Sequence, residues 1–128
     1  MIYLDSSALL KLLVLEPQSR SLERHLFGGS RYASCALARV EVVRAARRRS
    51  PVTAERAQPL LEPLELIVLD RPLLDVAADL EGDHLRSLDA IHVAAAQSLG
   101  DDLDELITYD RRMADAARAL GLPVAAPA

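Results

Sequence analysis

Short, mainly apolar segments alternate with helical segments along this chain, and this alternation constrains the fold more than any other feature. Three of these segments, "MIYL", "LIVL" and "LITY", are each followed directly by an aspartate, at Asp5, Asp70 and Asp110. Short apolar strands of this kind are typical of a parallel sheet whose two faces are both covered by helices. The sequence therefore predicts an α/β fold around a central parallel sheet.

The expected elements run from one end of the chain to the other. Strands are expected at residues 1–4, 31–33, 66–69 and 106–109, with a last edge strand near Val124. Helices are expected at residues 6–15, 19–26, 36–48, 53–61, 72–80, 87–99 and 111–120. The chain has 128 residues and neither an internal repeat nor a low-complexity linker, so we expect a single domain over residues 1–128.

Residues at the helix ends support this division. Ser34 and Ser87 are expected N-caps, because a serine oxygen can accept the hydrogen bond of a free amide in the first turn. Gly100 and Gly121 are expected to end the helices before them. Pro59 argues against the helix at 53–61, since a proline inside a helix removes one backbone donor.

The composition indicates the compartment. Half of the residues (51%) are hydrophobic but only four are Phe or Tyr and none is Trp, so the core must be aliphatic. The lone Cys35 excludes an internal disulfide and suits a reducing compartment. No apolar run approaches the ~18 residues of a membrane span, and the N-terminus lacks the basic region of a signal peptide. We therefore expect a cytoplasmic protein without a membrane segment.

The net charge of −4 conceals a basic segment. Six arginines lie between Cys35 and Arg56: Arg39, Arg44, Arg47, Arg48, Arg49 and Arg56. Such a helix can bind phosphate locally, because screening confines a surface field to about one Debye length. A solvated helix face explains the same arginines equally well, and both interpretations stay open.

The aspartates at the strand ends are candidates for chemistry. In parallel α/β sheets, functional groups gather beyond the carboxyl ends of the strands. Asp5, Asp70 and Asp110 all precede expected helices, however, so each can also be explained as an N-cap. Asp70 is a useful internal control, because it has the same local pattern as the other two.

Two further acids lie inside expected helices. Glu41 in "ARVEVVRA" can be part of a site, or can form a surface ion pair with Arg44. Asp89 in "RSLDAIHVAAA" can simply favour the helix dipole from the first turn, by about 0.3–1 kcal/mol. The helix that follows Asp89 is so apolar that most of it should be buried. A carboxylate carried toward the sheet in this way needs a positive partner.

A divalent cation would serve several such carboxylates at once. Mg²⁺ and Mn²⁺ prefer hard oxygen ligands, and a bound ion can position a water and stabilise charge on a phosphodiester. No other catalytic set is in view: there is no glycine-rich phosphate loop, and Cys35 has no evident partner. His25 and His84 lie in polar surroundings, and His92 is expected to be a packed core residue rather than a ligand.

The order of four segments resembles the PIN domain, and within it the VapC toxins of bacterial toxin–antitoxin pairs. These segments are "LDSSALLK", "ARVEVVRA", "RSLDAIHVAAA" and "LITYDRRM", and the resemblance spans nearly the whole chain. It implies a PIN-like three-layer α/β/α sandwich and a ribonuclease that depends on Mg²⁺ or Mn²⁺.

The resemblance also assigns residues to the site. Asp5, Glu41, Asp89 and Asp110 match the acidic quartet of the family. Among these acids, Asp5 and Asp89 would be the principal metal ligands, while Asp110 is the position that the family varies most. Ser6 and Thr108 match small hydroxyl residues that support the site by hydrogen bonds. Asp70 matches no acid of the family, which favours capping there.

Partners follow from the same resemblance. It implies an RNA substrate, a VapB-like antitoxin, homodimers and toxin–antitoxin hetero-oligomers. Leucines in the helices at 6–15 and 19–26 could form a groove for an apolar partner helix, although most of them should pack in the core.

Three alternatives remain. A phosphatase with a strand-end aspartate as nucleophile usually needs a second acid two residues on, where this chain has Ser7. A flap-type DNA nuclease shares the metal chemistry but usually requires a larger chain. A degenerate PIN module would act only as a protein- or RNA-binding partner, and the presence of all four acids argues against it.

Overall fold

A parallel β-sheet forms the centre of the computed structural model, which describes residues 1–29, 31–82 and 84–128. Its strands are β1 (Ile2–Leu4), β2 (Tyr32–Cys35), β3 (Glu65–Ile67), β4 (Glu105–Ile107) and β5 (Val124–Ala125). They lie in the order β3-β2-β1-β4-β5, and every neighbouring pair is parallel. The predicted α/β class with a central parallel sheet is confirmed.

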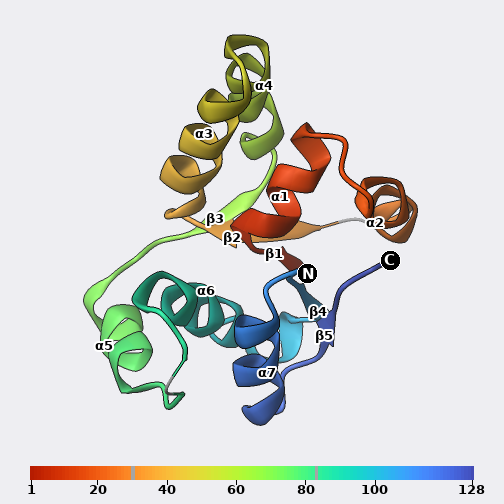
Figure 1. The fold of residues 1–128 in the computed structure, drawn as a ribbon. Coiled ribbons are helices and arrows are strands. Elements are labelled where there is room, and N and C mark those ends of the chain that lie inside the picture. Colours follow the sequence, from red (N-terminus) through yellow and green to blue (C-terminus); the bar gives the residue numbers. More distant parts are fainter. Residues whose placement is uncertain (30, 83) are drawn as a thin grey trace.

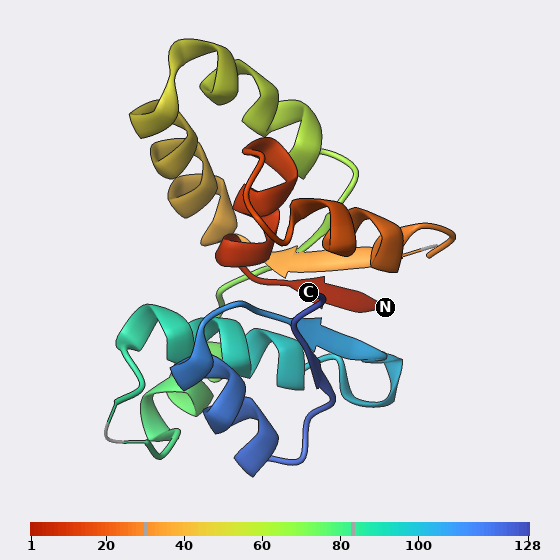
Figure 2. The ribbon, with the colours of Figure 1, turned by 45° about the vertical axis from the view of Figure 1, so that its right-hand side comes forward.

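Helices cover both faces of this sheet, as Figures 1 and 2 show. On one face lie α1 (Ser6–Leu13), α2 (Ser19–Leu26), α3 (Ala38–Arg49) and α4 (Pro51–Leu61). On the other lie α5 (Arg71–Asp79), α6 (Ser87–Gln97) and α7 (Arg111–Ala119), with a short 3-10 turn at Gly100–Asp102 before β4. The expected three-layer α/β/α arrangement is therefore correct. Within the described residues, no helix has the length and apolarity that crossing a bilayer requires.

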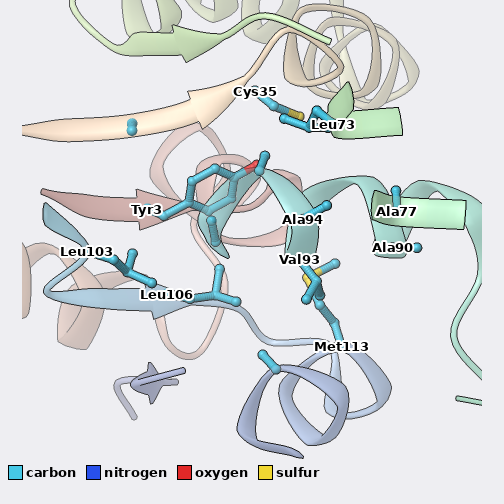
Figure 3. Close-up of a cluster of buried hydrophobic side chains, with 14 of the residues drawn as sticks. Tyr3, Cys35, Leu73, Ala77, Ala90, Val93, Ala94, Leu103, Leu106 and Met113 are labelled. Atoms are coloured by element: carbon cyan, nitrogen blue, oxygen red, sulfur yellow. The ribbon is translucent and has the colours of Figure 1, made fainter. Parts of the chain in front are cut away.

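Side chains alternate between the two faces of each strand and so build two cores. Tyr3, Cys35 and Leu106 point into the layer of α5–α7, where Val93 and Met113 pack against them (Figure 3). Leu4 and Ile107 point the other way, into a cluster of leucines, valines and alanines from α1, α2, α3 and α4. A fully buried Leu or Ile contributes about 1.5–3 kcal/mol, so these largely aliphatic clusters hold the three layers together.

Two of the expected N-caps are wrong. Ser34 lies inside β2, where it pairs with Leu66 of β3, and the strand continues to Cys35 before α3 begins at Ala38. Ser87 is the first residue of α6 rather than its cap. The pairing with β3 explains the first difference, because a backbone that belongs to a ladder cannot also begin a helix.

Helix α4 forms despite Pro59, which lies inside it. The helix begins with Pro51 at a position where the missing amide proton costs nothing, and the Ser50 side chain accepts a hydrogen bond from the Thr53 amide at 3.1 Å. Ala57 and Leu61 are buried against the neighbouring helices. Burial of this face offsets the local cost of the proline.

Candidate functional site

The order of the strands brings two of the predicted acids to the same edge of the sheet. β1 and β4 are adjacent, with Leu4 opposite Ile107, and Asp5 and Asp110 follow them. Each also serves as the N-cap of the next helix: Asp5 Oδ1 accepts from the Ala8 amide at 2.9 Å, and Asp110 Oδ1 accepts from the Met113 amide at 3.1 Å. Capping and a place at the edge of the sheet are thus compatible.

The carboxylate of Asp5 is buried and fully hydrogen-bonded. In addition to the Ala8 amide, its oxygens accept hydrogen bonds from Ser7 Oγ at 2.7 Å and from Thr108 Oγ1 at 2.6 Å, and only 2% of the residue is exposed. Burial raises the pKa of Asp5, while the bonds from Ser7 and Thr108 act in the opposite direction. Thr108 thus makes the kind of hydrogen bond that was expected of it, and its role in a functional site stays a prediction.

Glu41 reaches the site from α3 on the other side of the sheet edge. Its Oε1 accepts hydrogen bonds from Ser6 Oγ and from His92 Nε2, both at 2.7 Å. Burial alone would raise the pKa of Glu41, but these two bonds outweigh it and lower the pKa. Ser6 therefore holds one of the predicted acids by a hydrogen bond, and its role in a functional site stays a prediction. Glu41 forms its ion pair with His92, and among the described salt bridges none joins it to Arg44.

His92 connects this carboxylate to the core. The residue is 2% exposed, and its Nδ1 lies 2.8 Å from the Tyr3 hydroxyl and 3.7 Å from Cys35 Sγ. Burial by itself lowers the pKa of His92, but the hydrogen bonds with Cys35 and Glu41 prevail and raise the pKa to about 10. The expectation that Cys35 has no partner is wrong, because its sulfur contacts this imidazole.

Asp89 and Asp110 face an open cleft of about 510 Å³. The residues that line it are Glu41, Arg86, Leu88, Asp89, Asp110, Arg111 and Arg112. Partial burial raises the pKa of Asp89, the charge of Asp110 raises it further, and the charges of Asp5 and Glu41 add to the effect, while His92 opposes it. The fold therefore brings the four predicted acids close enough together for the charges of the other three to act on Asp89.

The donor chemistry of this cleft fits a hard divalent cation. Carboxylate oxygens are the ligands that Mg²⁺ and Mn²⁺ prefer, and a cation would relieve the repulsion that, in addition to burial, raises the pKa of Asp89. As positioned, however, no three Asp, Glu, His or Cys side chains of residues 1–29, 31–82 and 84–128 form a group that could hold one ion. Asp5 and Glu41 instead direct their oxygens to neighbouring hydroxyl, amide and imidazole donors.

The control residue behaves as a cap alone. Asp70 Oδ1 accepts from the Leu73 amide at 3.0 Å and begins α5. Its strand, β3, is separated from β1 by β2, and Asp70 is not part of the cleft lining. The local sequence pattern is the same as at Asp5, and the position in the sheet makes the difference.

The remaining histidines and the basic helix lie elsewhere. His25 forms an ion pair with Glu105, and His84 is exposed. Arg44, Arg47 and Arg48 are exposed on α3 and line a small depression of about 180 Å³ that contains no acid of the cleft.

Comparison with known proteins supplies the family. The sequence model of the PIN domain matches residues 2–119. Ribonuclease VapC46 of Mycobacterium tuberculosis (strain ATCC 25618 / H37Rv) is 48% identical over 126 residues, which cover 98% of this chain and 97% of that protein. Ribonuclease VapC47 of Mycobacterium tuberculosis (strain CDC 1551 / Oshkosh) is 40% identical over 132 residues, with 99% and 97% covered.

A solved structure shares the fold. A chain of a toxin–antitoxin complex from Klebsiella pneumoniae superimposes with a TM-score of 0.76 at 23% identity, over 100% of this chain and 98% of that one. At this level of identity the likeness concerns the fold alone. Together with the acids at the carboxyl edge of the sheet, the near-complete match to the family and the identity to its full-length relatives show that this chain belongs to the PIN domain family, in the group of the VapC proteins.

Proposed function

We propose that this protein is a Mg²⁺- or Mn²⁺-dependent endoribonuclease, the toxin of a VapBC toxin–antitoxin pair, which cleaves RNA phosphodiester bonds at the acidic cleft. The observation that carries this proposal is the convergence of four carboxylates, two from the segments that follow β1 and β4 (Asp5 and Asp110) and two from helices α3 and α6 (Glu41 and Asp89). Relatives that are 40–48% identical over nearly the full chain are named ribonucleases, which supports the RNA substrate.

The residues of the chain divide into ligands and supports. Asp5 and Asp89 would be the principal ligands of the cation, with Glu41 and Asp110 completing the acidic set. Ser7 and Thr108 hold the carboxylate of Asp5 from two sides. The bound ion would supply charge neutralisation and an activated water.

Glu41 is held in a similar way. Ser6 and His92 both donate to its Oε1, and Glu41 is part of the cleft lining. A carboxylate fixed by two donors on one oxygen keeps its orientation when substrate enters, which lowers the cost of ordering the site during the reaction.

An inhibitory partner completes the proposal. The solved toxin–antitoxin complex from Klebsiella pneumoniae supports an antitoxin that binds this fold. A VapB-like segment carrying Arg or Lys could enter the cleft and pair with Asp89 and Asp110, in competition with the cation. We also propose homodimers and toxin–antitoxin hetero-oligomers, as the family resemblance implies.

A second candidate is a PIN module that binds RNA or protein without cleaving. The observation in its favour is that the carboxylates, as positioned among the described residues, do not form a ligand group for a metal. For the nuclease proposal to hold, a cation would have to draw the other acids closer to the carboxylate that Ser6 and His92 hold.

A cleavage assay with one matched variant decides between them. Wild-type protein is incubated with a single-stranded RNA and a DNA of the same sequence, with Mg²⁺, Mn²⁺ or a chelator. We expect cleavage of RNA only, with either metal, and loss of cleavage in Asp89→Asn. Asp70→Asn is the control, because Asp70 is a strand-end acid outside the cleft and asparagine is also a good N-cap.

Two results would contradict the proposal. Wild-type rates from Asp89→Asn would show that the cleft acids are not the site. Metal binding without any cleavage of RNA would favour the binding module.

A further inference from the structure

Three arginines line the same cleft as the carboxylates. Arg86 is the residue that precedes α6, and Arg111 and Arg112 are the first two residues of α7. All three are exposed. They therefore place positive charge in the same lining as the acids, and none of these arginines belongs to the proposed cation site.

These arginines do not neutralise the acids beside them. Among the described residues, no carboxylate oxygen lies within 4.0 Å of a nitrogen of Arg86, Arg111 or Arg112. Their charge is thus available to a ligand that enters the cleft.

Their position in the helices is also unfavourable for stability. The N-terminus of a helix carries a partial positive charge, and a cation there costs what an anion would gain, about 0.3–1 kcal/mol. All three arginines stand at or beside the N-terminus of a helix. Asp89 and Asp110 lie at the same two helix ends and offset part of this cost, and a phosphate held by the arginines would offset more of it.

The cleft as a whole fits a nucleic-acid backbone better than an acidic peptide. Asp89 and Asp110 repel any anion that lies directly against them, so a ligand must place its charges beside the arginines instead, and a phosphodiester chain has phosphates on both sides of the bond that these acids would act on. The guanidinium group of arginine matches the geometry of phosphate through two parallel hydrogen bonds. Leu88 lies in the same lining and is 47% exposed, which gives a nucleobase an apolar surface.

We infer that Arg86, Arg111 and Arg112 bind the phosphates that flank the cleaved bond of a single-stranded RNA. The inference rests on the proposed function only for the identity of the cleaved bond. The binding of RNA by these residues can be measured without cleavage. The exposed arginines of α3 lie in a separate depression and are not part of it.

The test is the salt dependence of RNA binding. The background is Asp5→Asn, which should not cleave and which leaves the cleft lining intact because Asp5 is buried beneath it. Binding of a fluorescent single-stranded RNA is measured by anisotropy over a series of salt concentrations with Mg²⁺ present. The variants are Arg86→Gln, Arg111→Gln and Arg112→Gln, singly and together, with Arg24→Gln on α2 as the control. Arg24 is exposed and lies outside the cleft.

Each lost phosphate contact should flatten the plot of log K against log salt concentration by about 0.7. We expect the triple variant to bind RNA more weakly with a slope reduced by about two units, and Arg24→Gln to match the background protein. Circular dichroism checks the fold of each variant, and if the triple variant does not fold, the single variants carry the test.

Other outcomes overturn the inference. An unchanged slope in the triple variant, or no RNA binding by the background protein, would do so. Normal RNA binding together with weakened binding of the antitoxin would assign the arginines to the protein partner instead. RNA binding with the expected slopes but no cleavage by the wild type would leave this inference standing and remove the proposed nuclease function.

Discussion

The carboxylate of Glu41 reaches the cleft at the end of a hydrogen-bonded chain that begins in the core. Tyr3 of β1 contacts His92 Nδ1, and His92 Nε2 donates to Glu41. A buried polar chain of this kind fixes one arrangement of its members, because each member that loses its partner leaves a buried group unsatisfied.

Replacement of His92 should therefore affect both stability and the site. We expect His92→Phe to lower the free energy of unfolding by about 1–3 kcal/mol, since the Tyr3 hydroxyl is left without its partner. We also expect weaker Mn²⁺ binding, because Glu41 loses one of the two donors that orient it. Urea unfolding and calorimetric titration with Mn²⁺ measure the two effects.

His92→Gln is the matched variant, because an amide can still donate to Glu41. It should recover much of the Mn²⁺ affinity that His92→Phe loses. Equal affinity in His92→Phe and the wild type would show that His92 only packs in the core.

The raised pKa of His92 also predicts how stability depends on pH. The folded protein holds the His92 proton up to a pKa of about 10, whereas the unfolded chain releases it near 6.5. The folded state binds more protons in this range, so the stabilisation is complete below pH 6.5 and is lost as the pH rises toward about 10.

Urea unfolding across this pH range measures the effect, in a Cys35→Ala background that removes the thiol. The contribution of Cys35 to the pKa of His92 is lost there, but the Glu41 bond keeps the same sign. His92→Gln in that background should show a flatter dependence. A free energy of unfolding that does not fall with pH in the parent would contradict the protonated imidazole.

Several residues of the candidate site could be predicted from the sequence, and others could not. Asp5, Glu41 and Asp89 lie in recognisable segments, and Ser6 and Thr108 follow from the same match. The role of His92 was missed because its partners are far away in the chain: Tyr3 is 89 positions distant, Glu41 is 51 and Cys35 is 57. Only the three-residue spacing from Asp89 places His92 on the same face of α6, and spacing alone does not name a partner.

At the scale of elements, the acids of the cleft lie at the starts of helices. The charge of each acid is affected locally by the helix end and from farther away by the other acids. Asp89 lies in the first turn of α6, which favours an anion. Burial and, after it, the charges of Asp110, Asp5 and Glu41 disfavour the same charge and raise the pKa of Asp89.

Removal of this charge should stabilise the metal-free protein slightly. We expect Asp89→Asn to raise the melting temperature in the presence of a chelator. The gain in the free energy of unfolding should be less than about 1 kcal/mol, since repulsion among partly exposed charges is small. Thermal unfolding of the variant and the wild type measures the difference, and Asp70→Asn is again the control. A clear loss of stability in Asp89→Asn would show that its role in the helix outweighs the repulsion.

The sequence predicted the elements better than their ends. Each expected strand and helix has a counterpart, because apolar runs and helical periodicity are local signals. The strand expected at 66–69 lies at Glu65–Ile67 and the one at 106–109 lies at Glu105–Ile107. The ends of these strands depend on pairing between strands that are remote in sequence, as at Ser34. The local sequence therefore does not predict them.

For the whole molecule, the partner surface remains a prediction. The expected leucine groove on the first two helices is mostly core: Leu9, Leu13 and Leu22 are buried. Leu15 and Phe27, which follow α1 and α2, are 75% and 91% exposed.

Co-expression tests the antitoxin at this scale. We expect the chain alone to arrest growth and degrade RNA, and the product of the adjacent upstream gene to restore growth and form a complex that purifies as one species. The physical reason is that Glu41, Asp89 and Asp110 in an open cleft attract the Arg or Lys side chains of a basic segment. If the neighbour neither binds nor relieves the arrest, the toxin–antitoxin proposal fails, while the nuclease proposal is judged by its own assay.

The hydrogen-bonded chain from Tyr3 through His92 to Glu41 means that substitutions in the core of this protein can affect the cleft. A substitution among the side chains around Tyr3, such as Val93 or Leu106, shifts an anchor whose other end is a carboxylate at the reactive surface. A change in the packing of the α5–α7 layer therefore also moves a carboxylate that lines the cleft where we propose that RNA is cleaved.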